Sequence, residues 1–163
     1  MAGLPGTGKS TLARTLGHGL GWHVIDKDRH KAVLMKQGLE DDRAGKVSYE
    51  LAFDTAHTVL VELRTSVILD SAALHRFILE NSLTIVRDVQ NAQLKVIFCV
   101  ADRDLRNERL RNRPWQQATI RVDPETIADY LQHFKHLPSD KLTLYTIKPF
   151  EECLAAAREY LTN

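Results

Sequence analysis

Residues 3–11 read GLPGTGKST, and this stretch decides how the rest of the chain is interpreted. Gly3, Gly8, Lys9 and Ser10 match the pattern G-x-x-x-x-G-K-[ST] of a phosphate-binding loop. The glycines allow backbone N–H groups to curl around phosphate oxygens, and the N-terminus of the next helix adds partial positive charge. Lys9 is expected to reach the β- and γ-phosphates, and the Ser10 hydroxyl to ligate Mg²⁺. The predicted nucleotide-binding residues of the loop are Gly3, Pro5, Gly6, Thr7, Gly8, Lys9, Ser10 and Thr11.

The composition of the 163 residues fits one globular domain spanning residues 1–163. Hydrophobic residues make up 44% and charged residues 26%, and the net charge of +1 provides no overall attraction for nucleic acids or membranes. No apolar run approaches the roughly 20 residues that a bilayer crossing needs. We therefore expect a cytoplasmic protein without a membrane segment. Cys99 and Cys153 are expected to be reduced, buried and structural.

Helical and strand patterns alternate along the chain, which predicts an α/β fold with a parallel sheet covered by helices on both faces. A charged connection, EDDRAGK at residues 40–46, is expected to be a solvated turn. The predicted helices are 9–20, 28–38, 48–63, 72–89, 103–113, 126–134 and 150–161, and the predicted strands are 22–25, 66–70, 95–100 and 141–147.

A phosphate-binding loop normally follows a buried strand, and here Met1 and Ala2 leave no room for one. We expect the strands on either side of that position to have unpaired backbone groups and to border an open core. We therefore expect either that the sequence starts too late or that another segment fills this position.

Two carboxylates follow the strand at residues 22–25. Asp26 and Asp28 are two residues apart, so in an extended stretch their side chains point the same way. One of the two is expected to hold a metal-bound water, and the other to accept a proton from an incoming hydroxyl. Lys31 is expected to hold a negative or polar group of the acceptor. The alternative is that Asp28 only caps the helix that follows.

Asp70 is a third acid at the end of a predicted strand. It is expected either to orient the acceptor or to act as an outer-shell partner of Mg²⁺. The alternative is that it caps the helix predicted to begin near Ala72.

A run of arginines precedes a polar stretch at residues 111–122, which is expected to form a lid. Arg106, Arg109 and Arg113 recur at helical spacing and share one face, whereas Arg111 points elsewhere. Arg113 is expected to stabilise the charge of the transferred phosphoryl group, and Arg109 to pack on the nucleotide base. A solvated basic helix is the alternative for any one of them.

Two large classes of nucleotide-binding protein fit the sequence poorly. The DRAG stretch at residues 42–45 has the D-x-x-G spacing of a GTPase but lies in a polar connection, and no N/T-K-x-D motif follows. An ATPase motor would place a second carboxylate after VILD, where the chain has Ser71. Phosphoryl transfer to a bound acceptor fits better.

The stretches GLPGTGKSTLA, DKDRHK, SVILDSA and CVADRDLRNERLRNR together resemble the small P-loop kinases of the AAA-domain-like group. That group includes the kinase part of polynucleotide kinase, zeta toxins and chloramphenicol phosphotransferase, and gluconate and shikimate kinases are more distant relatives. The resemblance implies a three-layer P-loop sandwich with strand order 2-3-1-4-5 and ATP as the nucleotide. It also implies that Asp28 is the base, that Lys31 contacts substrate where arginine is commoner, and that Arg113 is the lid arginine.

The predicted function is therefore a Mg²⁺- and ATP-dependent kinase that phosphorylates a hydroxyl of a small molecule. The alternatives are a polynucleotide 5′-hydroxyl kinase and an ATP-binding module without catalysis. Near-neutral net charge gives the polynucleotide alternative little support.

Overall fold

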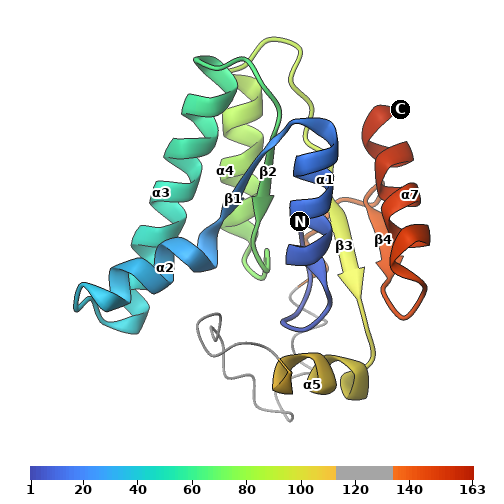
Figure 1. Ribbon diagram of the computed structural model, residues 1–163. Coiled ribbons are helices and arrows are strands. Elements are labelled where there is room, and N and C mark those ends of the chain that lie inside the picture. Colours follow the sequence, from blue (N-terminus) through green and yellow to red (C-terminus); the bar gives the residue numbers. More distant parts are fainter. Residues whose placement is uncertain (113–133) are drawn as a thin grey trace.

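The computed structural model describes residues 1–112 and 134–163 of the chain (Figure 1). Within these ranges, no helix is long and apolar enough to span a membrane. The strands are β1 (His23–Asp26), β2 (Val67–Asp70), β3 (Ile97–Val100) and β4 (Leu142–Tyr145). The helices are α1 (Lys9–Leu20), α2 (Lys27–Lys36), α3 (Asp41–Val61), α4 (Arg76–Arg87), α5 (Arg103–Arg111) and α7 (Phe150–Thr162).

These strands form two parallel pairs. β1 pairs with β2, and the register places His23 opposite Val67. β3 pairs with β4, and Ile97 lies opposite Leu142. Parallel pairing with intervening helices is what the alternating pattern of the sequence predicts.

The first residues of the chain run between these two pairs. The Met1 α-amino group donates to the Leu69 carbonyl at 2.8 Å, which connects the chain start to β2. On the other side, Ala2 N–H donates to the Ile97 carbonyl at 2.8 Å and the Ala2 carbonyl accepts from Cys99 N–H at 2.9 Å. With these residues counted as the first strand, the order is 2-3-1-4-5, as the resemblance implies.

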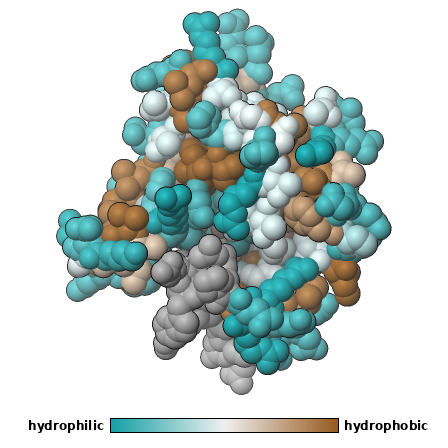
Figure 2. All heavy atoms as spheres, in the orientation of Figure 1, coloured by the Kyte–Doolittle hydropathy of each residue, from teal (hydrophilic) through white to brown (hydrophobic). Residues whose placement is uncertain are grey.

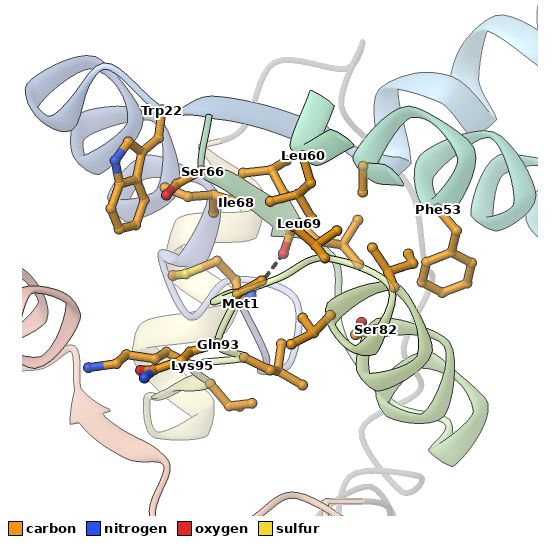
Figure 3. A pocket seen from close by; sticks show the side chains of 18 of the residues that line it. Met1, Trp22, Phe53, Leu60, Ser66, Ile68, Leu69, Ser82, Gln93 and Lys95 are labelled. Atoms are coloured by element: carbon orange, nitrogen blue, oxygen red, sulfur yellow. Dashed lines mark hydrogen bonds between the residues drawn. The ribbon is translucent and has the colours of Figure 1, made fainter. Parts of the chain in front are cut away.

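A cavity of about 800 Å³ lies next to these first residues, between β2 and β3 (Figure 3). Its lining includes Met1, Ile68, Leu69 and Phe53. The predicted open core is therefore present, although the first residues do pair with both neighbouring strands. Burial lowers the pKa of the Met1 α-amino group, partly opposed by the negative charge of Asp70.

Helices cover both faces of the strands, so the predicted three-layer sandwich is confirmed. One core cluster joins α1 and α7 to the strands through residues such as Leu16, Ile97 and Leu154. The opposite face packs against α3 and α4, as shown by the cluster that contains Ile78 and by the contact of Ile25 with α3. Figure 1 shows the same division, with α3 and α4 to the left of the strands and α7 to the right.

Some element boundaries differ from the prediction. The solvated turn at residues 40–46 is wrong, because α3 already begins at Asp41. Asp41 and Asp42 lie in its first turn, where carboxylates interact favourably with the helix dipole. The helix predicted from residue 72 begins at Arg76. Almost all of the helix predicted at 126–134 lies outside the described residues.

Candidate nucleotide and acceptor site

The loop before α1 takes a backbone path that needs glycine. Gly6 and Gly8 both have φ of +81°, in the left-handed region that other residues rarely adopt. A Cβ atom on Gly6 would lie 2.7 Å from the Arg106 carbonyl oxygen, and one on Gly3 would lie 2.5 Å from the Cys99 carbonyl oxygen. The glycines of the motif therefore serve both the turn and the close packing of the loop on β3 and α5.

The N-terminus of α1 is left uncapped by the side chains that the structure describes. Gly8 occupies the N-cap position, and the first turn contains no acidic residue. By contrast, Asp26 caps α2 and Asp102 caps α5. Lys9 is buried and is absent from the ion pairs formed within residues 1–112 and 134–163. The helix start thus presents N–H groups and a cation, the arrangement that binds phosphate.

Two acids end neighbouring strands beside this helix start. Asp26 and Asp70 lie opposite each other in the β1–β2 register. Asp70 is 4% exposed, and its Oδ1 has no hydrogen-bond partner among the described residues. Burial raises the pKa of Asp70, while the Lys9 ammonium and the Ser10 hydroxyl act in the opposite direction. Asp70 does not cap a helix, because α4 begins after His75, so that alternative is wrong.

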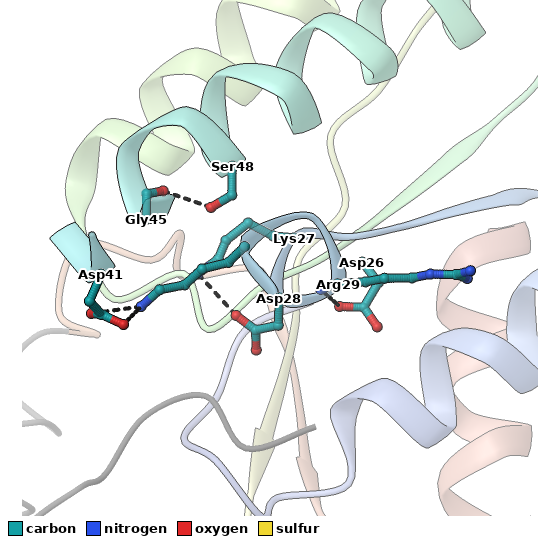
Figure 4. A network of polar contacts seen from close by, with 8 residues as sticks. Asp26, Lys27, Asp28, Arg29, Asp41, Gly45 and Ser48 are labelled. Carbon is teal, nitrogen blue, oxygen red and sulfur yellow. Dashed lines mark hydrogen bonds and ion pairs between the residues drawn. The ribbon is translucent and has the colours of Figure 1, made fainter. Parts of the chain in front are cut away.

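Asp26 and Asp28 do not project in the same direction from one extended stretch. β1 ends at Asp26, whose carboxylate caps α2 by accepting from Arg29 N–H at 3.1 Å. Asp28 lies in the first turn of α2, and its Oδ1 is 3.0 Å from the Lys27 ammonium. The prediction of parallel side chains is therefore wrong, and so is the alternative that Asp28 is the cap (Figure 4).

The buried face of α2 consists of two lysines. Lys27 and Lys31 are the buried residues of this helix, and their spacing of four places them on one face. The Lys31 ammonium lies 2.9 Å from each carboxylate oxygen of Asp41. The Lys27 ammonium lies 4.8 Å from the centre of the Tyr49 ring. The predicted acceptor residue Lys31 is thus buried and already paired with a carboxylate of α3.

Sequence reasoning missed Tyr49, Lys27 and Asp41. Burial raises the pKa of Tyr49 to about 12, with the negative charge of Asp28 acting in the same direction and Ser71 in the opposite one. The signal in the sequence was the pair Lys27 and Lys31 at helical spacing on this helix. Which helix would cover them could not be read from that spacing.

On the other side of the loop, Arg109 of α5 reaches the turn after β4. Its Nη1 donates to the Thr146 hydroxyl at 2.9 Å, and its Nη2 donates to the Thr146 carbonyl at 2.7 Å. Nη1 also lies 3.4 Å from the Gly6 carbonyl oxygen. Arg109 is therefore next to the loop, as a nucleotide-binding residue should be. Arg113, the predicted lid arginine, lies outside the described residues.

Arg106 differs from the other arginines of α5. It is 3% exposed, and its Nε has no hydrogen-bond partner within the part of the chain that the structure describes. Burial lowers the pKa of Arg106, partly opposed by Asp102. In Figure 2, the face of α5 that is turned to the viewer is mostly hydrophilic. The solvated basic helix therefore describes the outer face of α5 but not Arg106.

Residues 1–137 match a family model described as an AAA domain. The chain belongs to this AAA-domain family. No curated protein matches the sequence. The solved structures with the same fold include kinases, and the chain is a small P-loop kinase of the AAA-like group.

Three of these structures illustrate the similarity of the AAA-domain kinase to known proteins. A protein of Chloroflexus aurantiacus J-10-fl designated a kinase is 26% identical, with a TM-score of 0.73 and coverage of 99% of this chain and 93% of that chain. A gluconokinase from Sinorhizobium meliloti 1021 is 17% identical, with a TM-score of 0.62 and coverage of 99% and 89%. The APS kinase of Mycobacterium tuberculosis, solved with AMPPNP and APS, is 16% identical, with a TM-score of 0.66 and coverage of 99% and 95%.

The donor set of this kinase fits a magnesium ion that is also held by nucleotide phosphates. Among residues 1–112 and 134–163, no group of three or more His, Cys, Asp or Glu side chains could hold a metal. Mg²⁺ usually binds through one or two carboxylates, phosphates and water. The Ser10 hydroxyl and the carboxylates of Asp26 and Asp70 supply such oxygens at one end of the sheet. The buried Oδ1 of Asp70, unpartnered among the described residues, is consistent with this use.

Proposed function

We propose that this protein is a Mg²⁺-dependent kinase that transfers the γ-phosphoryl group of ATP to a hydroxyl of a small molecule. The observation that carries the proposal is the arrangement of Lys9, Ser10, Asp26 and Asp70 around the start of α1, with Asp28 on the adjoining helix. Phosphoryl transfer depends mainly on positioning and on stabilising charge, and these residues provide both.

The residues of the loop hold the nucleotide. Backbone N–H groups at the start of α1 would bind phosphate oxygens, and Lys9 would contact the β- and γ-phosphates. Ser10 and Asp26 would hold Mg²⁺, which would supply positive charge to neutralise the phosphates, and Asp70 would lie beside them at the end of β2. Arg113 supplies a further positive charge from the lid at residues 111–122, and Arg109 packs on the base.

The residues of α2 handle the acceptor. Asp28 is a third exposed on its side chain, so an incoming hydroxyl can reach it, and it accepts the proton that the hydroxyl loses. Lys27 lies beside Asp28, with its ammonium 3.0 Å from the Asp28 carboxylate. Lys31 contacts a polar or negative group of the acceptor while Asp41 balances its charge. The reaction belongs in the cytoplasm, where ATP is supplied.

The experiment measures transfer from radiolabelled ATP to pooled acceptors in the presence of magnesium. The pool contains sugars, sugar acids, nucleosides and an oligonucleotide with a free 5′-hydroxyl. Asp28→Asn is expected to lower the rate by about two orders of magnitude or more, since it removes the proton acceptor. Its affinity for ATP should stay close to that of the wild type, because Asp28 does not belong to the loop.

Asp54→Asn is the matched control, because Asp54 is exposed on α3 and far from the loop in sequence. Equal rates of transfer by Asp28→Asn and the wild type would show that Asp28 is not the base. A protein that binds ATP but labels nothing in the pool would instead be a binding module. Labelling of the oligonucleotide alone would identify a polynucleotide kinase.

A further inference from the structure

The carbonyl groups of a phosphate-binding loop need partners of their own. In a planar trans peptide, the C=O and the following N–H point in opposite directions. When N–H groups turn inward to phosphate, the carbonyls of the same peptides turn outward, and a buried one needs a donor. Here the Thr7 carbonyl accepts a hydrogen bond from the Thr146 hydroxyl at 2.9 Å. Thr7 is 2% exposed, so water does not easily replace that donor.

The geometry around Thr146 decides the direction of these bonds. A guanidinium can only donate, so the Thr146 hydroxyl accepts from Arg109 Nη1. The single hydroxyl proton is then available to the Thr7 carbonyl at 2.9 Å, in preference to the Val100 carbonyl at 3.4 Å. Two further bonds hold Thr146 itself: Arg109 Nη2 donates to its carbonyl, and its N–H donates to the Val100 carbonyl at 2.8 Å. Thr146 thus links α5, β3 and the loop.

We propose that Thr146 is a positioning residue of the nucleotide site, whose hydroxyl holds the Thr7–Gly8 peptide with the Gly8 N–H directed toward the phosphates. Arg109 supports this by holding the hydroxyl from the opposite side. The inference rests on the proposed nucleotide site and adds a residue that is 139 positions from Thr7 in sequence. It acts through the loop backbone and does not require Thr146 to touch the nucleotide.

The test compares Thr146→Val with Thr146→Ser in the full chain. Valine keeps the shape of threonine but removes the hydroxyl, whereas serine keeps the hydroxyl. The probes are magnesium tripolyphosphate, ADP and adenosine, with dissociation constants measured by calorimetry. Thr146→Val is expected to weaken the binding of tripolyphosphate and ADP about tenfold, from the loss of hydrogen bonds in a partly buried network. Thr146→Ser should bind both probes within about twofold of the wild type.

Adenosine distinguishes this role from a contact with the base. Its binding should change much less than that of ADP in Thr146→Val, because adenosine has no phosphate for the Gly8 N–H to meet and Arg109 keeps its hydrogen bond to the Thr146 carbonyl. Thr143→Val, in the strand that leads into this turn, is the matched control and should bind like the wild type. Melting temperatures of all variants report whether the fold is retained, and Thr146→Ala provides a second variant without the hydroxyl if valine does not fold.

The outcomes separate this inference from the proposed function. If the wild type binds neither tripolyphosphate nor ADP, the nucleotide site itself is wrong. If the wild type binds both and a folded Thr146→Val binds them equally well, the role of Thr146 is wrong. If Thr146→Ser loses as much binding as Thr146→Val, the role of Thr146 is also wrong, because serine retains the hydroxyl.

Discussion

Gly17 of α1 lies directly against Val24 of β1. A Cβ atom placed on Gly17 would be 2.3 Å from the Val24 Cγ2 and 3.0 Å from the Trp22 carbonyl oxygen. These distances are too short for any side chain, so the absence of one at Gly17 allows the helix that follows the phosphate-binding loop to approach the sheet.

Gly17→Ala is expected to destabilise the protein by roughly 1–3 kcal/mol, because the helix or the strand must move to make room. Gly45→Ala is the matched control, since a Cβ atom on Gly45 of α3 would meet no atom of the described residues within 4 Å. That change should stabilise the helix by about 0.5–1 kcal/mol. Urea unfolding of both variants gives the two changes in the free energy of unfolding. Changes of the same sign would contradict the close approach of Gly17 to Val24.

Asp70→Asn is expected to stabilise the protein without nucleotide while weakening magnesium-dependent ATP binding. Burial raises the pKa of Asp70, so the folded state binds its proton more tightly than the unfolded state does. The stability that follows from this is fully present below the unfolded pKa and is lost as the pH rises through the folded one. Asparagine does not ionise, so the Asp70→Asn variant should not lose this stability. Its melting temperature should therefore vary less between acidic and neutral pH than that of the wild type.

The Asp70 prediction fails if asparagine lowers the melting temperature at neutral pH, or if ATP binding keeps its magnesium dependence. Asp26→Asn is a useful comparison in the same register. It alters the cap of α2, so it should lower stability by about 1 kcal/mol or less, because asparagine also caps helices well.

Cys99→Val is expected to flatten the loss of stability at alkaline pH. Burial raises the pKa of the Cys99 thiol from 9.0 to about 11. The folded state therefore favours the protonated thiol, and this contribution is lost as the pH rises from about 9 to about 11. It amounts to at most roughly 3 kcal/mol. Chemical unfolding across this range checks it, and an unchanged slope in the valine variant would contradict it.

Lys31→Met and Asp41→Asn are expected to have unequal effects on stability. Methionine keeps most of the buried stem of Lys31, and the Asp41 carboxylate left behind is 66% exposed, so the loss should be about 1 kcal/mol or less. Asparagine at Asp41 leaves a buried ammonium with a weaker partner and should cost more. Unfolding free energies test this order. A more stable Asp41→Asn would show that the pair contributes nothing to the fold.

The same lysine variant tests the acceptor site once an acceptor is known. Lys31→Met should raise the KM for the acceptor and leave the KM for ATP unchanged, because Lys31 lies on α2 and not on the loop. A change in the KM for ATP alone would show that Lys31 acts on the nucleotide and not on the acceptor.

Much of the site could be predicted because its residues are close in sequence. Gly3 to Thr11 form one local motif, and the phosphate-binding role predicted for it follows from its glycines and from the backbone N–H groups of a helix start, which any such stretch provides. The alternation of helices and strands likewise follows from local hydrophobic patterns, and parallel strands then bring Asp26 and Asp70 to the same edge. These inferences needed no knowledge of which distant side chains meet.

The orientation of the Asp28 side chain could not be predicted, because it depends on where β1 ends and α2 begins. A shift of one or two residues in that boundary changes the side chain from extended to helical geometry. The incorrect prediction of a turn at residues 40–46 has a similar cause. A charged stretch without an apolar stripe can still be helical when its acidic residues lie at the start of a helix.

The amino-acid sequence by itself determined the phosphate-binding loop, the α/β architecture and the acids at the strand ends, because these depend on local backbone preference and on the spacing of apolar residues. Only the tertiary structure decided that Thr146 and Arg109 hold the loop, that Asp41 pairs with Lys31, and that the chain start lies between β2 and β3. Those contacts join residues far apart in sequence, and they form only when the packing of whole helices and strands brings the partners within hydrogen-bonding distance.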